Sequence, residues 1–309
     1  MGILVIDPGL STTVQDAGRP GYREWGVPLS GAFDRGSADM ANALLGNSPD
    51  CAVLELTLSG GMYQAEGPMA LALTGAPMEA KILRLDSTEH ALQLPLSFSL
   101  LDGDRLVLGR THIGARTYLA VKGGWRTRLH LGSRSSEQRV RAGEILPADA
   151  GTIPTRRPCE PAWRSPIDEP FRIIEGPDGR SLSDFDDAFG ADRRFRVGSR
   201  SDRMGLRLEG DPVPVAFAPE RLSTPVSPGA IQVAGGQLIV LGVACGTMGG
   251  YPHVAHVISA DLDRLGQLKP GDSVAFRRVI VEEARSLDQS ARQARKALIH
   301  RLATLAEDA

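Results

Sequence analysis

The stretch TTVQDAGRPGYREWGVPLSGAFD occupies residues 12–34, between a β-like run at 3–7 and a predicted helix at 35–47. Four glycines and two prolines interrupt it, and acidic, basic and aromatic side chains stand between them. Proline fixes φ and glycine tolerates positive φ, so Gly18-Arg19-Pro20-Gly21 should form a tight turn. Such a composition suits either an ordinary connection or a loop built to hold a ligand.

The charged residues of this stretch suit an anionic ligand. Backbone amides of the turn, with the side chains of Arg19 and Arg23, can bind a carboxylate or a phosphate. Ser30 and Asp34 stand just before the predicted helix, whose N-terminus is a further anion-binding position. Ser30, Asp34 or Ser37 could equally cap that helix, and residue chemistry alone favours capping because it is the commoner role.

Short β-like runs dominate the rest of the chain. The 35 glycines and 21 prolines punctuate these runs at close spacing, which favours barrels or sandwiches over a parallel sheet alternating with helices. The runs occupy residues 3–7, 52–58, 69–75, 104–109, 116–124, 171–176, 204–210, 230–236, 238–246 and 272–281.

Only three segments have helical spacing of apolar residues. Residues 35–47 end in Gly46-Asn47, which is a C-cap signal, and residues 181–190 stop at Gly190. Residues 281–308 form the longest predicted helix, with a thin apolar stripe that favours a surface helix packed on its own domain over a partner-binding helix. The stripe consists of Leu287, Ala291, Ala294, Leu298, Leu302 and Leu305.

A proline-rich segment divides the chain almost in half. Residues 147–170 contain six prolines without periodicity, which is typical of a linker or a long connection. The halves share a faint order of elements: MALALTGA and then LDGDRLVLG in the first, QLIVLGVACG and then KPGDSVAF in the second. This weak internal similarity suggests two copies of one β fold.

Composition and charge exclude several classes of protein. A chain of 309 residues with 42% hydrophobic and 23% charged residues suits one or two globular domains with a sizeable core. The net charge of −2 offers no basic field, so we expect no nucleic-acid partner. The N-terminus lacks the features of a signal peptide and no apolar run reaches membrane-spanning length, so we expect a cytoplasmic protein without a membrane partner.

Cysteine and histidine spacing gives no indication of a metal. Cys51, Cys159 and Cys245 are widely separated and odd in number, which fits a reducing compartment without a disulfide framework. His253 and His256 lie three apart in a strand-like run, so we expect them on opposite faces of a strand and expect no metal. Walker A, Rossmann and G-x-S-x-G motifs are also lacking from the sequence.

A second glycine-rich cluster, GTMGGYPHVAHVISADL, covers residues 246–262. Gly249-Gly250 permits close approach of a ligand to the backbone, and Tyr251 offers a hydroxyl. This cluster and the stretch at 12–34 belong to a series of blocks that spans nearly the whole chain. The blocks are VQDAGRPGYREWGVPLSGAFD (14–34), ADMANALLGN (38–47), LELTLSGG (54–61), ALTGAP (72–77), GARTYLAVKGGW (114–125), LGSRSS (131–136), SDRMGLRLEG (201–210), SPGAIQV (227–233) and GGYPHVAHVISADLDRLGQLKPGD (249–272).

In this order the blocks resemble the carboxyltransferase-like family, which includes the 5-oxoprolinase C subunit, the second subunit of allophanate hydrolase and the carboxyltransferase region of urea carboxylase. The resemblance implies a mainly β protein with a few helices and two tandem cyclophilin-like β-barrel domains. We expect these domains at 1–155 and 156–282, followed by a C-terminal helix at 283–309. It also implies sibling subunits as partners and a small amide or carboxylate as substrate.

Three functions are consistent with the resemblance. The first is the C subunit of an ATP-dependent 5-oxoprolinase-type amide hydrolase, with ATP handled by the assembled complex and no activity expected of this chain alone. The second is a biotin-dependent carboxyltransferase; the sequence lacks a biotin-attachment Met-Lys, so another chain would carry biotin. The third is a non-catalytic regulatory protein that binds the sibling subunit.

The resemblance also shifts the interpretation of the opening stretch toward a ligand site. It implies catalytic roles for Asp16, Arg19 and Asp34, in which arginines and backbone amides stabilise negative charge and an aspartate orients a donor or moves a proton. The implied substrate-binding residues are Gln15, Gly18, Gly21, Ser30, Gly31, Arg203 and Tyr251.

The chain departs from the family pattern in its second half. Acidic, amide and hydroxyl residues expected before Gly-Gly-Tyr-Pro are replaced, which removes charge and hydrogen-bonding groups from one pocket and favours the regulatory alternative. The connection between LGSRSS and RAGEIL is also shorter than usual. The replacing residues are Ala244, Gly246 and Met248, with Thr224 in place of an acid and His253 in place of a lysine.

Overall fold

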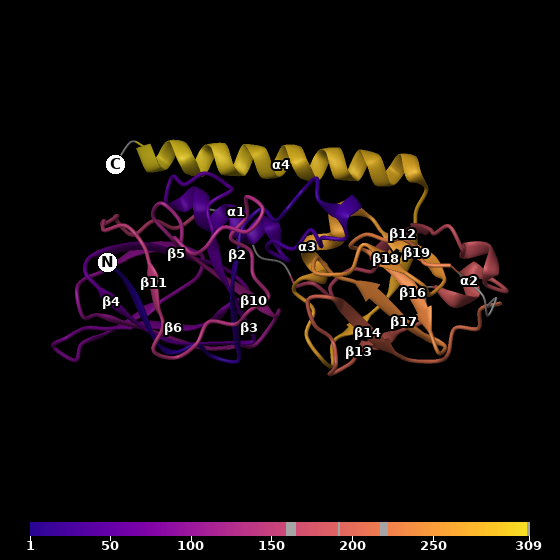
Figure 1. Ribbon diagram of the computed structural model, residues 1–309, viewed down its shortest axis with the longest axis horizontal. Coiled ribbons are helices and arrows are strands. Elements are labelled where there is room, and N and C mark those ends of the chain that lie inside the picture. The colour runs from indigo at the N-terminus through magenta and orange to yellow at the C-terminus, as the bar shows by residue number, and fades with distance from the viewer. Residues whose placement is uncertain (159–164, 191, 217–221, 308–309) are drawn as a thin grey trace. The chain divides into compact units, whose positions relative to one another are not determined.

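The computed structural model describes residues 1–158, 165–190, 192–216 and 222–307, with backbone alone for 305–307. The chain forms two compact units that are interleaved along the sequence (Figure 1). Unit 1 comprises Met1–Gly18, Asp34–Ser165 and Ala294–Ala309, and unit 2 comprises Arg19–Phe33 and Pro166–Gln293. The chain therefore leaves unit 1 after Gly18 and returns to it at Asp34. The division at residues 155 and 282 expected from the resemblance stays a prediction.

The predicted class is confirmed, because the structure is mostly β and includes a nearly closed, barrel-shaped sheet. Unit 1 contains a six-stranded sheet in the order β11-β1-β4-β9-β6-β7 and a five-stranded sheet in the order β2-β3-β10-β5-β8. The strands of the first are Ile145–Pro147, Gly2–Asp7, Ser59–Glu66, Arg105–Thr111, Met78–Leu83 and Glu89–Leu92. Those of the second are Ser11–Gln15, Val53–Thr57, Arg116–Val121, Met69–Gly75 and Leu96–Leu100.

The five-stranded sheet is buried on both faces. Along β10 every residue is buried, and alternate side chains differ in kind: Leu119 and Val121 join the hydrophobic core of unit 1, whereas Arg116 and Tyr118 engage in polar contacts. Strand side chains alternate between faces, so one face of this sheet supplies the core and the other carries a buried polar layer. That polar face positions the residues of the candidate site in unit 1.

Helix α1 (Arg35–Leu44) confirms the predicted helix at 35–47. Asp34 is its N-cap: the carboxylate accepts hydrogen bonds from the Ser37 amide at 2.9 Å and from the Ser37 hydroxyl at 2.6 Å. Gly46 follows the helix with φ of 64°, as expected of a C-terminal glycine. The helix lies against β5 and β10 and buries one apolar face, which comprises Ala38, Met40, Ala41, Leu44 and Leu45.

Unit 2 contains an eight-stranded sheet in the order β20-β13-β14-β17-β16-β19-β12-β21 and a two-stranded sheet of β15 and β18. Its core gathers four phenylalanine rings, Phe171, Phe189, Phe195 and Phe276, of which Phe276 contacts the other three. The strands of the larger sheet are Ser273–Val274, Phe195–Val197, Gly205–Glu209, Gln237–Leu241, Ala230–Ala234, His253–Val257, Phe171–Glu175 and Phe276–Arg278, and the smaller sheet pairs Thr224–Pro225 with Met248–Gly249.

Two predicted elements differ in extent from those observed. The run at 272–281 is two strands: β20 pairs antiparallel with β13, and β21 pairs parallel with β12 at the opposite edge of the sheet. Only Ala275 separates the two strands, so this segment joins the two edges of the sheet and nearly closes it into a barrel. The helix predicted at 181–190 is reduced to α2 (Phe185–Ala188), because Asp184 caps it through the amides of Asp186 and Asp187. A 3-10 turn, η2 (Gly179–Ser181), precedes it.

Shorter helical turns and the long C-terminal helix complete the fold. The short elements are η1 (Arg23–Trp25), η3 (Ser259–Asp261) and α3 (Leu262–Leu265). Helix α4 (Val281–Glu307) confirms the predicted C-terminal helix. Its apolar stripe is only partly covered: Leu302 is buried, whereas Ala291 and Ala294 are exposed. The side chain of Leu305, which was also assigned to the stripe, lies outside the described side chains.

The proline-rich connection begins as a segment that packs on β8. The Ser97 amide donates to the Arg156 carbonyl at 2.9 Å, and the Ser99 hydroxyl donates to the Ile153 carbonyl at 2.9 Å. Residues 159–164 of the predicted connection, Cys159 among them, lie outside the described residues. Within the described part of the chain, no helix is long and apolar enough to cross a membrane.

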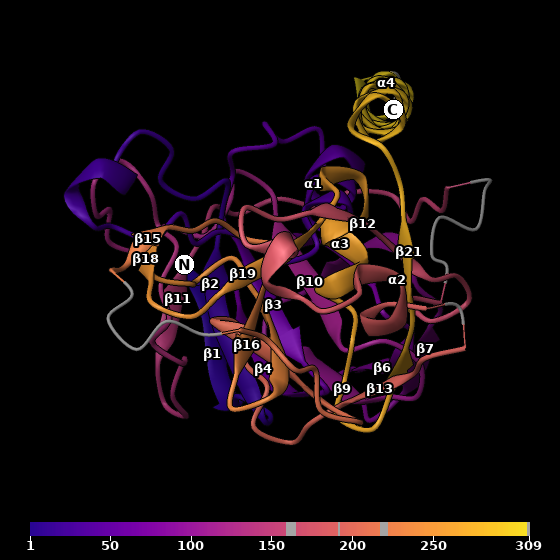
Figure 2. The same ribbon diagram turned by 90° about the vertical axis from the view of Figure 1, so that its right-hand side faces the viewer.

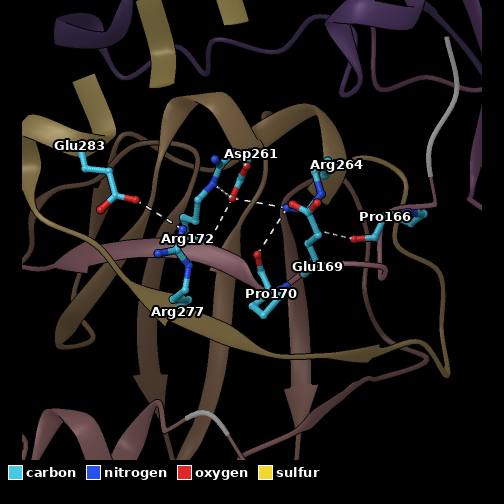
Figure 3. Close-up of polar contacts among 8 residues, drawn as sticks. All are labelled: Pro166, Glu169, Pro170, Arg172, Asp261, Arg264, Arg277 and Glu283. Atoms are coloured by element: carbon cyan, nitrogen blue, oxygen red, sulfur yellow. Dashed lines mark hydrogen bonds and ion pairs between the residues drawn. The ribbon is translucent and has the colours of Figure 1, made fainter. Parts of the chain in front are cut away.

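A buried ion-pair cluster in unit 2 joins strand β12 to the helical turns η3 and α3 (Figure 3). The fully buried carboxylate of Asp261 accepts hydrogen bonds from the Arg172 amide at 2.8 Å and from its Nε at 3.1 Å. Arg264 lies 3.5 Å from the same carboxylate, donates to the Pro166 carbonyl at 2.9 Å and stacks 4.4 Å above the Phe171 ring. The hydrogen bonds to Asp261 raise the pKa of Arg172, so this guanidinium stays charged at any physiological pH.

We predict that Asp261→Ala lowers the free energy of unfolding by about 3 kcal/mol, because it leaves two guanidinium groups without their buried counter-charge. Urea unfolding followed by tryptophan fluorescence measures the loss. The control is Asp288→Ala, which removes the partner of Arg292 on the exposed surface of α4 and should cost about 0.5 kcal/mol. Equal losses in the two variants would contradict the role given to Asp261.

Candidate functional site

Asp16, at the end of β2, organises a turn and a neighbouring loop of unit 1. Its Oδ1 accepts hydrogen bonds from the Gly18 amide at 2.8 Å and from the hydroxyls of Ser133 and Ser135, both at 2.6 Å. Its Oδ2 accepts from the Arg134 amide at 2.5 Å. Four donors therefore surround this carboxylate, and together they fix the LGSRSS block against the start of the glycine-rich stretch.

Gln15 lies beside Asp16 but is fully buried. Its Nε2 donates to the Thr13 hydroxyl at 3.0 Å and to the Ser136 carbonyl at 2.8 Å. Its Oε1 is buried without a hydrogen-bond partner among the described residues. An unpaired buried acceptor is costly, so this oxygen is a position at which a ligand donor or a water would gain a hydrogen bond.

Asp34 stands where the chain returns to unit 1, on the polar face of the five-stranded sheet. Its amide donates to the Tyr118 hydroxyl at 2.8 Å, and that hydroxyl donates to Glu55 Oε2 at 2.9 Å. Arg116 Nε donates to Glu55 Oε1 at 3.2 Å. All three supporting side chains are buried. Asp34 thus caps the helix, as residue chemistry favoured. The hydrogen-bonded network of Tyr118, Glu55 and Arg116 holds its backbone amide.

In unit 2, Gly31 is hydrogen-bonded to Arg203, and its neighbour Ser30 is hydrogen-bonded to Val243. The Ser30 amide donates to the Val243 carbonyl at 2.9 Å, and Arg203 Nη2 donates to the Gly31 carbonyl at 2.7 Å. Ser30 has φ of 55°, a left-handed conformation that is uncommon for residues other than glycine. The structure therefore brings together these three predicted residues, from both halves of the sequence.

The remaining part of the glycine-rich stretch folds back on itself within unit 2. The Arg19 amide donates to the Leu29 carbonyl at 2.8 Å, which closes the base of the loop. Gly21 has φ of 90° and faces open space, so a glycine is needed there for conformation and not for room. Figure 2 shows the short helix η1 of this loop beside β15 and β18, and the Arg23 guanidinium donates to the Val226 carbonyl that follows β15.

The segment that departs from the family pattern adjoins this group. Ala244 and Cys245 are buried, and the Ala244 amide donates to the Arg203 carbonyl at 3.0 Å. Burial raises the pKa of the Cys245 thiol, although the nearby guanidinium of Arg23 opposes this. Tyr251 lies beyond Gly249-Gly250, and 51% of its surface is exposed.

The expectation that His253 and His256 point to opposite faces of a strand is wrong. His256 Nδ1 and His253 Nε2 are 3.3 Å apart, and the ring centroids are 5.3 Å apart with the ring planes tilted by 50°. The cause is an irregularity in β19: its pairing register with β16 shifts between Ile231 and Gln232, so the alternation of side chains is lost. No cluster of three or more His, Cys, Asp or Glu residues that could hold a metal occurs in the part of the chain that the structure describes.

Sequence reasoning missed the residues that support the predicted ones. Glu55, Arg116 and Tyr118 hold Asp34, and Ser133 and Ser135 hold Asp16. A glutamate within the apolar run AVLELTL was a usable signal, because a charge in a buried strand requires a partner. A surface cavity of about 240 Å³ in unit 1, lined in part by Arg84 and Arg105, contains none of the predicted residues.

Comparison with known proteins places these features in a family. Residues 25–278 match the family described as carboxyltransferase domain, subdomain A and B. The chain is 35% identical over 298 residues to the 5-oxoprolinase C subunit of Escherichia coli, and the match covers 91% of this chain and 92% of that protein. It is 29% identical over 328 residues to urea amidolyase of Saccharomyces cerevisiae, a match that covers 94% of this chain but only 17% of that protein.

The fold is also similar to that of a solved enzyme. The crystal structure of the Kluyveromyces lactis urea carboxylase superposes with a TM-score of 0.84 at 25% identity. The match covers 96% of this chain and 29% of that chain. This chain therefore corresponds to a part of the fungal proteins and to nearly the full length of the bacterial subunit.

We predict that Asp16→Asn weakens the attachment of the LGSRSS loop (131–136) to the end of β2. The asparagine side chain has one accepting oxygen and cannot accept all four hydrogen bonds that the carboxylate receives. The loss of unfolding free energy should be about 2 kcal/mol, and the Arg134 amide should exchange with solvent at least about tenfold faster. The control is Asp7→Asn, since Asp7 forms the same kind of turn with the Gly9 amide but is exposed. Unchanged exchange at Arg134 would contradict this role.

We also predict a pH dependence of stability from His256. Burial, and next the proximity of His253, lower its pKa from 6.5 to about 4. As pH falls from about 6.5 toward 4, the unfolded chain takes up a proton that the folded chain refuses, so stability falls across that window. Substitution of His256 by Gln should reduce this slope, whereas substitution of the exposed His300 should leave it unchanged; unfolding at several pH values measures both.

Proposed function

Because the chain belongs to the carboxyltransferase-domain family, we propose that it is the C subunit of an ATP-dependent 5-oxoprolinase-type amide hydrolase. The observation that carries the proposal is the match to the 5-oxoprolinase C subunit of Escherichia coli over about nine tenths of both chains. The urea amidolyases match over a similar share of this chain but are several times longer.

In this proposal the complex couples the hydrolysis of ATP to ADP and phosphate with the hydrolysis of 5-oxoproline, in which water adds to the lactam carbonyl and the C–N bond breaks to give glutamate. The reacting amide becomes anionic as its carbonyl is attacked, so cationic side chains and backbone amides stabilise that charge. Arg19 and Arg203 supply the positive charge. Gly18, Gly21 and Gly31, all at positive φ, allow the backbone to turn its amides toward a ligand.

The two aspartates to which the resemblance assigns catalysis act as positioning residues in this proposal. Asp16 already accepts four hydrogen bonds, so its carboxylate holds the turn at Gly18 in shape. Asp34 caps α1 through Ser37 and orients the end of the loop. Gln15, Ser30 and Tyr251 contribute hydrogen-bonding groups for the substrate, and Gln15 Oε1 has no hydrogen-bond partner among the described residues.

The proposed setting is a cytoplasmic complex with sibling subunits, in which this chain is inactive alone. A biotin-dependent carboxyltransferase is the competing activity, because relatives named urea amidolyase and urea carboxylase share this domain. The altered segment around Ala244 favours a regulatory subunit instead, since it carries no charged side chain from residue 242 to residue 251. The three functions give different outcomes in one assay of the assembled complex.

We predict that the complex of this chain with its sibling subunits releases glutamate from 5-oxoproline only when ATP is present. Arg19→Ala should reduce kcat by about 100-fold, since it removes a charge that stabilises the transition state. The matched control is Arg200→Ala, an exposed arginine of the same unit, which should leave kcat unchanged.

The result is interpretable only for complexes that assemble equally well, which size-exclusion chromatography of each variant establishes. A stable complex without turnover of 5-oxoproline would contradict the hydrolase. Transfer of a carboxyl group from carboxybiotin to urea or a related amide by the same preparation would support the carboxyltransferase instead. Absence of both activities would support the regulatory subunit.

A further inference from the structure

A layer of buried polar side chains lies on the face of the five-stranded sheet that adjoins α1. Thr13, Glu55, Tyr118 and Thr74 occupy paired positions on four neighbouring strands: Thr13 opposite Glu55, Glu55 opposite Tyr118, and Tyr118 opposite Thr74. All four are buried. Such a layer is costly unless its groups are paired. The hydrogen bonds of Glu55, Tyr118 and Thr74 lead to the return of the chain at Asp34 and Ser37, whereas Thr13 accepts from Gln15.

The direction of the central hydrogen bonds follows from their donors. The Asp34 amide can only donate, so the Tyr118 hydroxyl accepts from it and directs its own proton to Glu55. Arg116 holds the other oxygen of Glu55 and compensates its charge. Burial, and next the charge of Glu55, raise the pKa of Tyr118 well above its ordinary value, so the hydroxyl keeps this proton.

Strand β5, next to β10, makes a second hydrogen bond to the first turn of α1. Thr74 donates to the Ser37 carbonyl at 2.6 Å, and Ser37 in turn donates to the Asp34 carboxylate. The first turn of α1 is therefore fastened to the sheet through its backbone at Asp34 and Ser37. Since the cap residue itself is held, the position of Asp34 does not depend on the helix alone.

We propose that Tyr118 and Glu55 are positioning residues that anchor the end of the loop at residues 19–33. The inference rests on the proposed function, in which this loop contributes Arg19, Ser30 and Gly31. Asp16 fastens the chain just before the loop through Gly18, and Tyr118 fastens it just after the loop through Asp34. Release at Asp34 removes one of these two fixed points and leaves the end of the loop held only by its hydrogen bonds within unit 2, so the groups there that bind substrate become less well ordered.

The test compares two tyrosine-to-phenylalanine variants by amide hydrogen exchange of the full chain. Tyr118→Phe removes the anchoring hydroxyl. Tyr63→Phe is the matched control, because Tyr63 is equally buried in unit 1 and its hydroxyl also makes two close hydrogen bonds, with Thr12 at 3.2 Å and with the Gly60 carbonyl at 3.0 Å. We expect about tenfold faster exchange at Asp34 and in residues 27–33 for Tyr118→Phe alone.

The same variants in the assembled complex separate positioning from stability. Tyr118→Phe should lower kcat by about tenfold more than Tyr63→Phe, with similar losses of thermal stability in both. Exchange that is equal in the two variants would overturn the inference, and so would faster exchange without the difference in kcat. If the wild-type complex does not turn over 5-oxoproline, the proposed function fails, and the exchange comparison alone decides whether the anchor exists.

A second variant keeps the test decisive if Tyr118→Phe does not fold. Glu55→Gln preserves the shape of the side chain and an oxygen that can accept from Tyr118, but it removes the charge that pairs with Arg116. We expect faster exchange at Asp34 in this variant also. Protection at Asp34 equal to that of the wild type would overturn the role assigned to Glu55.

Discussion

The fold around the candidate site depends on the carboxylate of Asp16, whose oxygens need hydrogen-bond donors. Asp16 has four donors within 2.5–2.8 Å, and three of them come from the loop at Ser133–Ser135. Because these donors are far from Asp16 in sequence, the carboxylate connects the end of β2 to a distant loop. It also sets the turn at Gly18, where the chain leaves unit 1. The glycine-rich stretch therefore starts from a fixed point.

Much of the β architecture follows from the sequence, because strands buried on one or both faces have a recognisable spacing and glycine or proline boundaries. All ten predicted β-like runs contain observed strands. The differences arise where pairing over long distances overrides local pattern. The run at 272–281 is divided because its two parts pair at opposite edges of a sheet, and the facing of His253 and His256 depends on a bulge that no local signal indicates.

The sequence predicted the loop residues of the candidate site. It did not predict the buried side chains that hold this loop in place. Residues such as Ser30 and Gly31 stood out by composition and by resemblance, and they lie together with Arg203 in unit 2. The support by Glu55 and Tyr118 requires the strand register, which places them opposite each other, and register cannot be derived from one strand alone. A family resemblance identifies which residues recur, whereas the hydrogen bonds show what holds them.

The central claim is that the segment from Gln15 to Asp34 contacts the substrate of a 5-oxoprolinase-type complex. The most direct measurement is amide hydrogen exchange of the assembled complex with and without 5-oxoproline. The account predicts that 5-oxoproline slows exchange within residues 15–34 and at Arg203. Unchanged exchange in this segment, with protection confined to the sibling subunits, would contradict the claim.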